Sequence, residues 1–235
     1  MTLYQSPVQF IEEPHQYLLN GKELSGITKI LHDLVFPDMY SQDIPDFVLK
    51  RAAALGGKLH RDLQFRFLGL PIDYPMAEVE LYENLVEQNP WMQKQIASEY
   101  IISDERSVAS SIDAIYYVNE QTVILADFKR TSILQIPYLE YQLSTYATLF
   151  ELANPEIKVG KLMAIHLRQE KNKSISRAIE INRIPNEVIW QLIFSYQLDL
   201  PRFENPYICN IIESGEGLLI RKDKPQVSKK YFVLE

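Results

Sequence analysis

Two acidic residues and a lysine occur in two short segments near the middle of the sequence, Asp113 in the first and Asp127 with Lys129 in the second. Both segments have the β-branched and aromatic composition of strands. Residues two apart on a strand share a face, so Asp127 and Lys129 are expected to point the same way. Most neighbours are apolar, and an unpaired buried charge is costly. Either a bound cation or an Asp–Lys ion pair is therefore needed to compensate the carboxylates.

The spacing of the two segments predicts how they pair. The expected strands, 108–118 and 123–128, are joined by a tight turn centred on Glu120. Asp113 and Asp127 each lie seven residues from Glu120. Paired strands are ~4.8 Å apart. In a hairpin the two carboxylates would therefore lie opposite each other, close enough to hold one ion.

These groups suit phosphodiester hydrolysis. Mg²⁺ and Mn²⁺ prefer oxygen ligands, and Mg²⁺ usually takes one or two carboxylates together with water and substrate phosphate. Such ions activate water and polarise phosphoryl oxygens. A neighbouring lysine such as Lys129 can orient or deprotonate the water and stabilise developing charge. An acid two residues before a lysine also recurs by chance, so the pattern alone leaves a purely structural ion pair open.

Two helical pairs flank the expected strands. Gly56 precedes His60 by four residues in the expected helix 47–68, and Gln142 precedes Tyr146 by four in the expected helix 138–152. Residues four apart are neighbours on one face of a helix. Taken singly, a histidine or a Gln/Tyr pair at such a place is most often structural.

Taken in order, these motifs resemble the RecB-like branch of the PD-(D/E)XK nuclease superfamily. The family pattern is G-x-x-x-H on a helix, an acid at the start of a strand, (G/S)-x-D on the next strand, (D/E)-x-K on its neighbour and Q-x-x-x-Y on the following helix. The positions that fill it here are Gly56 to His60, Glu99, Ser111 to Asp113, Asp127 to Lys129, and Gln142 to Tyr146. The resemblance covers residues 50–170.

The resemblance implies a role for each residue. His60, Asp113, Asp127 and the backbone carbonyl of Phe128 would ligate Mg²⁺ or Mn²⁺, and Lys129 would act on the attacking water. Glu99 would be an acid at the edge of the catalytic site, either a ligand of a second metal or a group that supports the ligands. Gln142 and Tyr146 would position DNA or the end of the catalytic strand. Arg130 and Thr131 would be further substrate-binding residues.

The chain departs from the family pattern at three points. Asp127 stands where many members carry glutamate, Ser111 replaces a glycine, and Arg130 is inserted before the Thr-Ser of the D-x-K-T-S run. Members with a four-cysteine iron–sulfur cluster are excluded, because Cys209 is the single cysteine. No phosphate-binding G-x-x-x-x-G-K-(S/T) loop occurs, so no nucleotide cofactor is expected.

The expected fold class is α/β, with a PD-(D/E)XK restriction-endonuclease-like core of order αβββαβ, in which helices flank a mixed central sheet. We expect an N-terminal hairpin and helix extension over 1–46, the nuclease core over 47–200 and a C-terminal extension over 201–235. Asn20-Gly21 predicts the hairpin turn, and Ser25 or Thr28 is expected to cap the helix that follows. Gly56 and Gly57 are expected to interrupt the helix 47–68.

Composition limits the classes of protein. The 235 residues are 46% hydrophobic, enough for a sizeable core. The single cysteine fits a reducing cytoplasm, and neither a signal peptide nor a membrane span is expected. The net charge of −7 argues mildly against nucleic acid. However, a metal site gathers acids, and the run 221–230 is locally basic, which is typical of a solvated tail or a DNA contact.

The function implied by the resemblance is hydrolysis of DNA by a metal-dependent nuclease. The stand-alone size resembles phage exonucleases and the mitochondrial genome-maintenance exonuclease, and residues 15–31 resemble the opening of phage-type members. An exonuclease acting on ends or single strands in repair, recombination or phage DNA processing is therefore expected. A single-strand annealing or recombination protein is a further candidate partner. The alternatives are an inactive nuclease fold that binds DNA or such a partner, and an unrelated α/β protein in which Asp127 simply pairs with Lys129.

Overall fold

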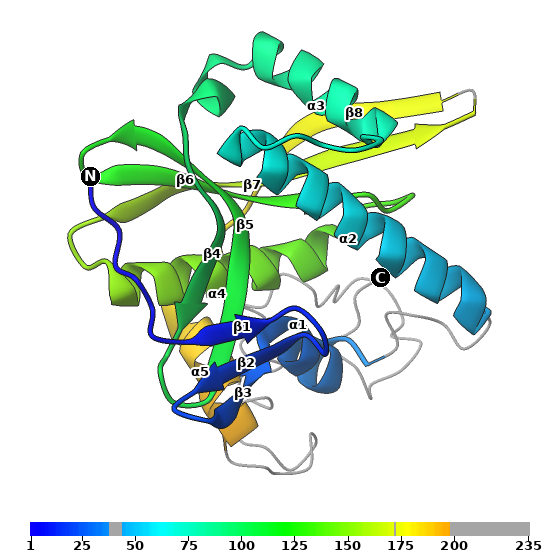
Figure 1. Ribbon diagram of the computed structural model, residues 1–235. Coiled ribbons are helices and arrows are strands. Elements are labelled where there is room, and N and C mark those ends of the chain that lie inside the picture. Colours follow the sequence, from blue (N-terminus) through cyan, green and yellow to red (C-terminus); the bar gives the residue numbers. More distant parts are fainter. Residues whose placement is uncertain (38–43, 172, 198–235) are drawn as a thin grey trace, which may run out of the picture.

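The structure is a computed structural model that describes residues 1–37, 44–171 and 173–197. Cys209, the expected C-terminal extension over 201–235 and the basic run 221–230 lie outside these residues. The described chain is a mixed α/β fold, as predicted, in which helices flank one eight-stranded sheet (Figure 1).

The order of helices and strands in the core is confirmed, and most bounds agree with the sequence to within a few residues. The strands are β1 (Gln9–Ile11), β2 (Gln16–Leu19), β3 (Lys22–Gly26), β4 (Gln95–Ser103), β5 (Val108–Asn119), β6 (Thr122–Lys129), β7 (Lys158–Glu170) and β8 (Lys173–Ile181). The α-helices are α1 (Ile27–Ile30), α2 (Asp46–Leu68), α3 (Ala77–Gln88), α4 (Ile136–Ala153) and α5 (Asn186–Gln197). A π-helical turn, η1 (Leu31–Val35), continues α1, and a 3₁₀ turn, η2 (Pro90–Lys94), precedes β4.

Strand β5 organises the sheet because it has three neighbours. Strand β4 pairs antiparallel along one edge, from Gln95 opposite Tyr116 to Ser103 opposite Ala109. The other edge is divided between β3, which pairs parallel at its start, and β6, which pairs antiparallel over its second half. Among the described strands, none pairs with residues 110–113 on that edge. Asp113 therefore lies in the fork where β3 and β6 diverge.

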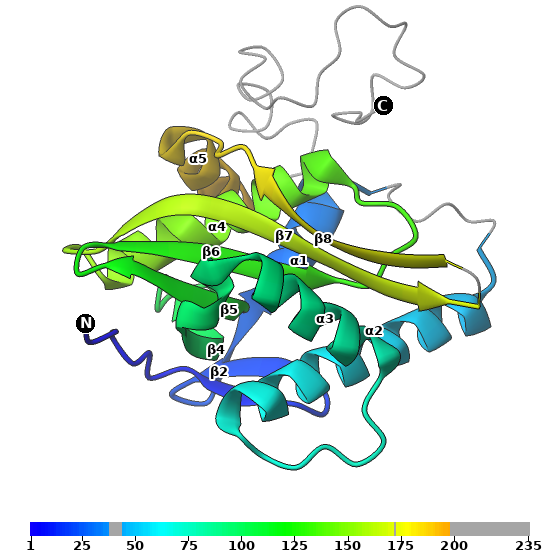
Figure 2. The same cartoon turned by 90° about the horizontal axis from the view of Figure 1, so that it is seen from above.

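Two hydrophobic clusters cover the two faces of the sheet. Helices α4 and α5, with α1 and η1, pack on one face around buried residues such as Leu143 and Leu192. Helices α2 and α3 pack on the other face through residues such as Leu59 and Tyr82. Figure 2 shows the sheet between these two helical layers. No helix in the described ranges is long and apolar enough to cross a membrane.

The N-terminal hairpin is part of the same sheet. Strands β2 and β3 pair antiparallel around the predicted Asn20-Gly21 turn, where both residues have positive φ. Neither Ser25 nor Thr28 caps the next helix, which is a correction to the prediction: Gly26 holds the N-cap position and no side chain bonds there. The Ser25 hydroxyl instead lies 2.6 Å from the Tyr196 hydroxyl on α5. The Ser25 side chain therefore forms a tertiary hydrogen bond rather than the expected helix cap.

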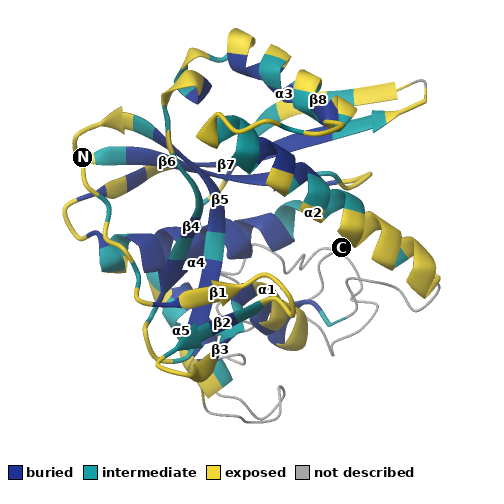
Figure 3. Ribbon diagram, viewed as in Figure 1, coloured by how far each residue is buried: buried dark blue, intermediate teal, exposed yellow. Residues whose placement is uncertain are grey.

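Helix α2 is continuous through Gly56 and Gly57, which corrects the predicted interruption. A helical glycine costs only ~1 kcal/mol relative to alanine, and burial of Leu59 and Leu63 downstream holds this 23-residue helix together. Most of the first half of α2 is exposed (Figure 3). A Cβ added at Gly56 or Gly57 would meet no described atom within 4 Å.

Alanine at Gly56 or Gly57 should stabilise the protein. Because space is open at both positions, each substitution is expected to raise the free energy of unfolding by about 0.8–1.0 kcal/mol through helix propensity. Urea unfolding measures the effect, and Ala53→Gly on the exposed part of the same helix is the matched control with the opposite sign. A loss of stability in the alanine variants would show that the glycines are required by packing.

Candidate metal centre and catalytic site

The hairpin β5–β6 brings the two predicted acids together. Ala114 pairs with Ala126 and Ile115 with Leu125, so Asp113 and Asp127 occupy the next position of the same register, as the sequence predicted. Beyond these backbone pairs, a side chain links the two strands: the amide of Phe128 on β6 donates a hydrogen bond of 2.6 Å to Asp113 Oδ2 on β5. This bond holds the Asp113 carboxylate at the open end of the hairpin.

A cluster of three ligand-bearing residues forms around Asp113. One ligand atom from each of His60, Glu99 and Asp113 lies within 4.8 Å of the other two. His60 Nδ1 is 3.4 Å from Asp113 Oδ1 and 3.7 Å from Glu99 Oε1. Helix α2 supplies the histidine, β4 the glutamate and β5 the aspartate. The predicted ligands included His60, Asp113 and Asp127, with Glu99 at the edge as a second-metal or supporting group. The structure gathers Glu99 with His60 and Asp113.

Glu99 reaches the cluster through an unusual backbone conformation. On β4, Ser98 pairs with Ala114 and Tyr100 with Ile112, which places Glu99 opposite Asp113. Its φ of 49° lies in the left-handed region, which costs a non-glycine residue on the order of 1–3 kcal/mol. The Ser111 hydroxyl donates a short hydrogen bond to Glu99 Oε2. Strained residues of this kind gather at functional sites.

The Phe128 carbonyl orients His60. His60 Nε2 lies 3.2 Å from that oxygen, and a histidine that ligates through one ring nitrogen commonly donates its other N–H to a backbone carbonyl. This arrangement leaves Nδ1 facing the two carboxylates. The Phe128 carbonyl, predicted as a metal ligand, is thus a partner of the imidazole in this structure.

Asp127 lies beside the cluster, with Lys129. Its Oδ2 is 2.6 Å from Lys129 Nζ, so the two side chains form an ion pair. Burial raises the pKa of Asp127 to about 6; the Lys129 charge counteracts this, and Asp113 adds to it. The Asp127–Lys129 ion pair that the purely structural alternative expects is present, and the same pair is compatible with a neighbouring metal site.

Gln142 and Tyr146 lie side by side on α4, as predicted. Gln142 Nε2 donates to Asp127 Oδ1 at 3.0 Å and to the Tyr146 hydroxyl at 2.7 Å. Both residues are 3% exposed. Gln142 thus contacts Asp127 near the end of β6, which is the arrangement expected of a residue that positions the end of the catalytic strand. The contact of both residues with DNA stays a prediction.

Arg130 and Thr131, the two residues after Lys129, contact parts of the protein outside the centre. Arg130 Nε lies 2.7 Å from Glu78 Oε1 on α3, and the same oxygen accepts the amide of Gln169 on β7. This ion pair ties the end of β6 to α3, where the sequence predicted a substrate contact. Thr131 accepts a hydrogen bond from His166 Nε2 through its backbone oxygen and lines a neighbouring pocket.

Electrostatics at the centre favour an anionic cluster around a cationic imidazole. Burial opposes the charge of His60, but Asp113 and Glu99 outweigh it and raise the histidine pKa well above its usual value. Burial likewise opposes ionisation of Asp113, but His60, Lys129 and the Phe128 amide together lower its pKa. The two carboxylates therefore favour a positive charge at this point of the centre.

The donor set fits a divalent cation. Two carboxylates and an imidazole converge from three elements, and carboxylate oxygens suit Mg²⁺ and Mn²⁺ whereas imidazole suits transition metals. Gln142 Oε1, buried beside Asp127, has no hydrogen-bond partner among the described residues, and such a group normally has one. These observations leave the identity of the metal open.

Metal binding should strengthen as pH rises. His60 has a raised pKa, so at neutral pH the metal must displace its proton. Below about pH 6 Asp127 also takes up a proton, and removal of this negative charge weakens the site further. Mn²⁺ titration calorimetry between pH 5.5 and 8.5, in buffers of different ionisation enthalpy, measures affinity and proton release. An affinity that is flat across this range, or that rises toward low pH, would contradict the assignment.

Comparison with known proteins assigns no family. No family model and no curated protein matches the chain. The crystal structure of SSO0001 is similar with a TM-score of 0.40 and 16% identity, over 77% of this chain and 79% of the other. The "Putative exonuclease" of Eubacterium rectale is similar with a TM-score of 0.40 and 9% identity, over 88% and 86% of the two chains. Both similarities are too weak to assign a fold family or a function.

Proposed function

We propose that this protein is a divalent-metal-dependent DNA nuclease of the RecB-like branch of the PD-(D/E)XK superfamily. One observation carries the proposal: His60, Glu99 and Asp113 converge within 4.8 Å, beside a lysine that pairs with a second buried aspartate. The order α2, α3, β4, β5, β6, α4, β7 supports it, because it contains the αβββαβ core expected for this superfamily.

Each residue of the centre would have a separate role in hydrolysis. His60, Glu99 and Asp113 would hold the ion, which when bound would activate water and polarise the scissile phosphoryl group. Lys129 would orient the attacking water and stabilise the charge that develops on the phosphate. Asp127 would position the Lys129 ammonium, with Gln142 and Tyr146 holding Asp127 in place.

The substrate proposed is DNA at ends or in single strands. This preference comes from the resemblance to stand-alone RecB-like exonucleases. Mg²⁺ and Mn²⁺ are the proposed cofactors, with neither an iron–sulfur cluster nor a nucleotide.

Digestion of end-labelled DNA tests the proposal. Single-stranded and duplex DNA, labelled at either end, are incubated with Mg²⁺, Mn²⁺, Zn²⁺ or EDTA. Degradation only with metal is expected, and the product ladder gives the polarity. Absence of cleavage of DNA and RNA, together with absence of Mn²⁺ binding by calorimetry, would overturn the proposal. DNA binding without cleavage would instead favour an inactive nuclease fold with a binding role.

A further inference from the structure

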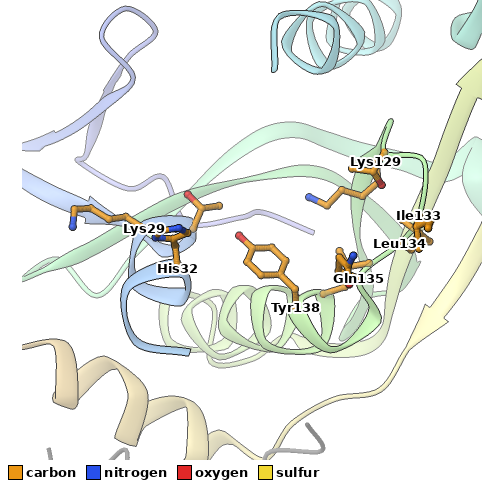
Figure 4. A pocket seen from close by; sticks show the side chains of 10 residues that line it. Lys29, His32, Lys129, Ile133, Leu134, Gln135 and Tyr138 are labelled. Carbon is orange, nitrogen blue, oxygen red and sulfur yellow. The ribbon is translucent and has the colours of Figure 1, made fainter. Parts of the chain in front are cut away.

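A pocket adjoins the candidate centre on the side of the N-terminal helix. It has a volume of about 410 Å³ and is lined by residues of α1, η1, the end of β6, the loop after it and the start of α4. In Figure 4, Lys129 reaches into it from one end and the Tyr138 hydroxyl points in from α4. His32 and Lys29 lie at the other end, where the Lys29 side chain extends outward from the pocket. Lys129 thus belongs both to this pocket and to the proposed catalytic centre.

The lining combines two kinds of surface. Lys29, His32 and Lys129 carry nitrogen donors, which suit phosphate oxygens. Leu134 and Leu139 form an apolar wall beside them, and Ile133 at the pocket is 70% exposed. Cationic groups at two ends with an apolar wall between them match a nucleotide, which has a charged backbone and a hydrophobic base.

Lys29, at the outer end of the pocket, can exchange its ion-pair partner. Lys29 forms a short ion pair with Asp33, and His32 Nδ1 lies 3.3 Å from the same carboxylate. Lys29 Nζ also lies 6.0 Å from the centre of the Tyr196 ring. The Lys29 and Asp33 side chains are 62% and 40% exposed, and an exposed ion pair contributes little to stability. A phosphate can therefore replace Asp33 as the partner of Lys29 at small cost.

We propose that this pocket holds one unpaired nucleotide next to the scissile phosphate, with a phosphate against Lys29 and His32 and the base or sugar against Ile133. The proposal rests on the proposed function and adds the substrate class, a single polynucleotide strand. The volume of about 410 Å³ lies at the low end of the ~300–1,000 Å³ of small-molecule pockets, which suits one nucleotide.

The salt dependence of binding tests the proposal. Binding of a fluorescent twelve-nucleotide oligothymidylate is measured from 50 to 300 mM salt in Ca²⁺, with cleavage checked on the same samples. Each phosphate contact on a single strand contributes about 0.7 to the slope of log affinity against log salt. Lys29→Gln is expected to reduce that slope by about 0.7 and to weaken binding about tenfold. Asp33→Asn should strengthen binding, because it removes the competing carboxylate.

Two further variants complete the test. Ile133→Asp should weaken binding about tenfold without a change in thermal stability, because the side chain is exposed. Lys161→Gln is the matched control, since Lys161 forms an exposed pair with Glu180 on the β7–β8 edge, and it should leave the slope unchanged.

The outcomes separate the two proposals. If the wild type cleaves DNA but Lys29→Gln and Ile133→Asp bind the strand like Lys161→Gln, the nucleotide pocket is wrong and the nuclease assignment stands. If the wild type binds the strand with the expected dependence on Lys29 but never cleaves, the pocket stands and the nuclease assignment fails. Equal or tighter binding of a blunt duplex in competition would overturn the single-strand class.

Discussion

Replacement of Lys129 by alanine is expected to lower the rate of DNA hydrolysis about 10²- to 10⁴-fold, the usual contribution of a positioned proton-transfer group. The lysine is 22% exposed and its ammonium lies 2.6 Å from Asp127, so it can reach a water at the centre while the buried carboxylate holds it. Mn²⁺ binding at pH 8 should persist, because His60, Glu99 and Asp113 remain.

A structural role for Lys129 predicts a different pattern. Removal of one partner of a buried ion pair costs about 3–5 kcal/mol of stability, so thermal unfolding is measured on the same samples. Lys129→Gln retains a hydrogen-bond donor near Asp127 and keeps the test informative if the alanine variant does not fold. A folded variant of either kind with activity within tenfold of the wild type would remove Lys129 from the mechanism. Lys161→Ala, in an exposed pair, is the control for loss of a lysine.

Asp113→Asn is expected to abolish detectable cleavage and to weaken Mn²⁺ binding by more than about 100-fold. Even residues that only orient a metal ligand cost about 10- to 100-fold in affinity or activity when mutated, and Asp113 is central to the proposed ligand set. Asparagine has the same shape and can accept the Phe128 amide bond through its own oxygen, so the hairpin should persist. The substitution also removes the largest influence that raises the His60 pKa, and this pKa should therefore fall.

Calorimetry with Mn²⁺ and NMR titration of the histidine ring measure these two effects. Asp73→Asn, in an exposed loop, serves as the control for loss of an acidic charge. Glu99→Gln tests whether the residue that the structure places beside His60 and Asp113 is a metal ligand: a loss of Mn²⁺ affinity comparable to that of Asp113→Asn places Glu99 among the ligands. Wild-type Mn²⁺ affinity in Asp113→Asn would exclude the cluster as the metal site.

The sequence by itself determined the local part of the centre. Alternation of side chains along a strand places Asp127 and Lys129 on one face, and the position of the turn sets the β5–β6 register that brings Asp113 beside Asp127. Helical spacing likewise placed Gln142 beside Tyr146. These relations depend on a few consecutive residues and on backbone geometry, so they can be read without a fold.

Only the tertiary structure decided which groups share the centre. His60 meets the Phe128 carbonyl across 68 positions of sequence, and Glu99 enters the cluster through a positive φ that its residue type does not predict. Arg130 turns to Glu78, 52 positions away, and Lys29 lines the same pocket as Lys129. The physical reason is that spacing fixes the face of an element on which a side chain lies, whereas its partner is fixed by how elements distant in sequence pack to bury their apolar faces.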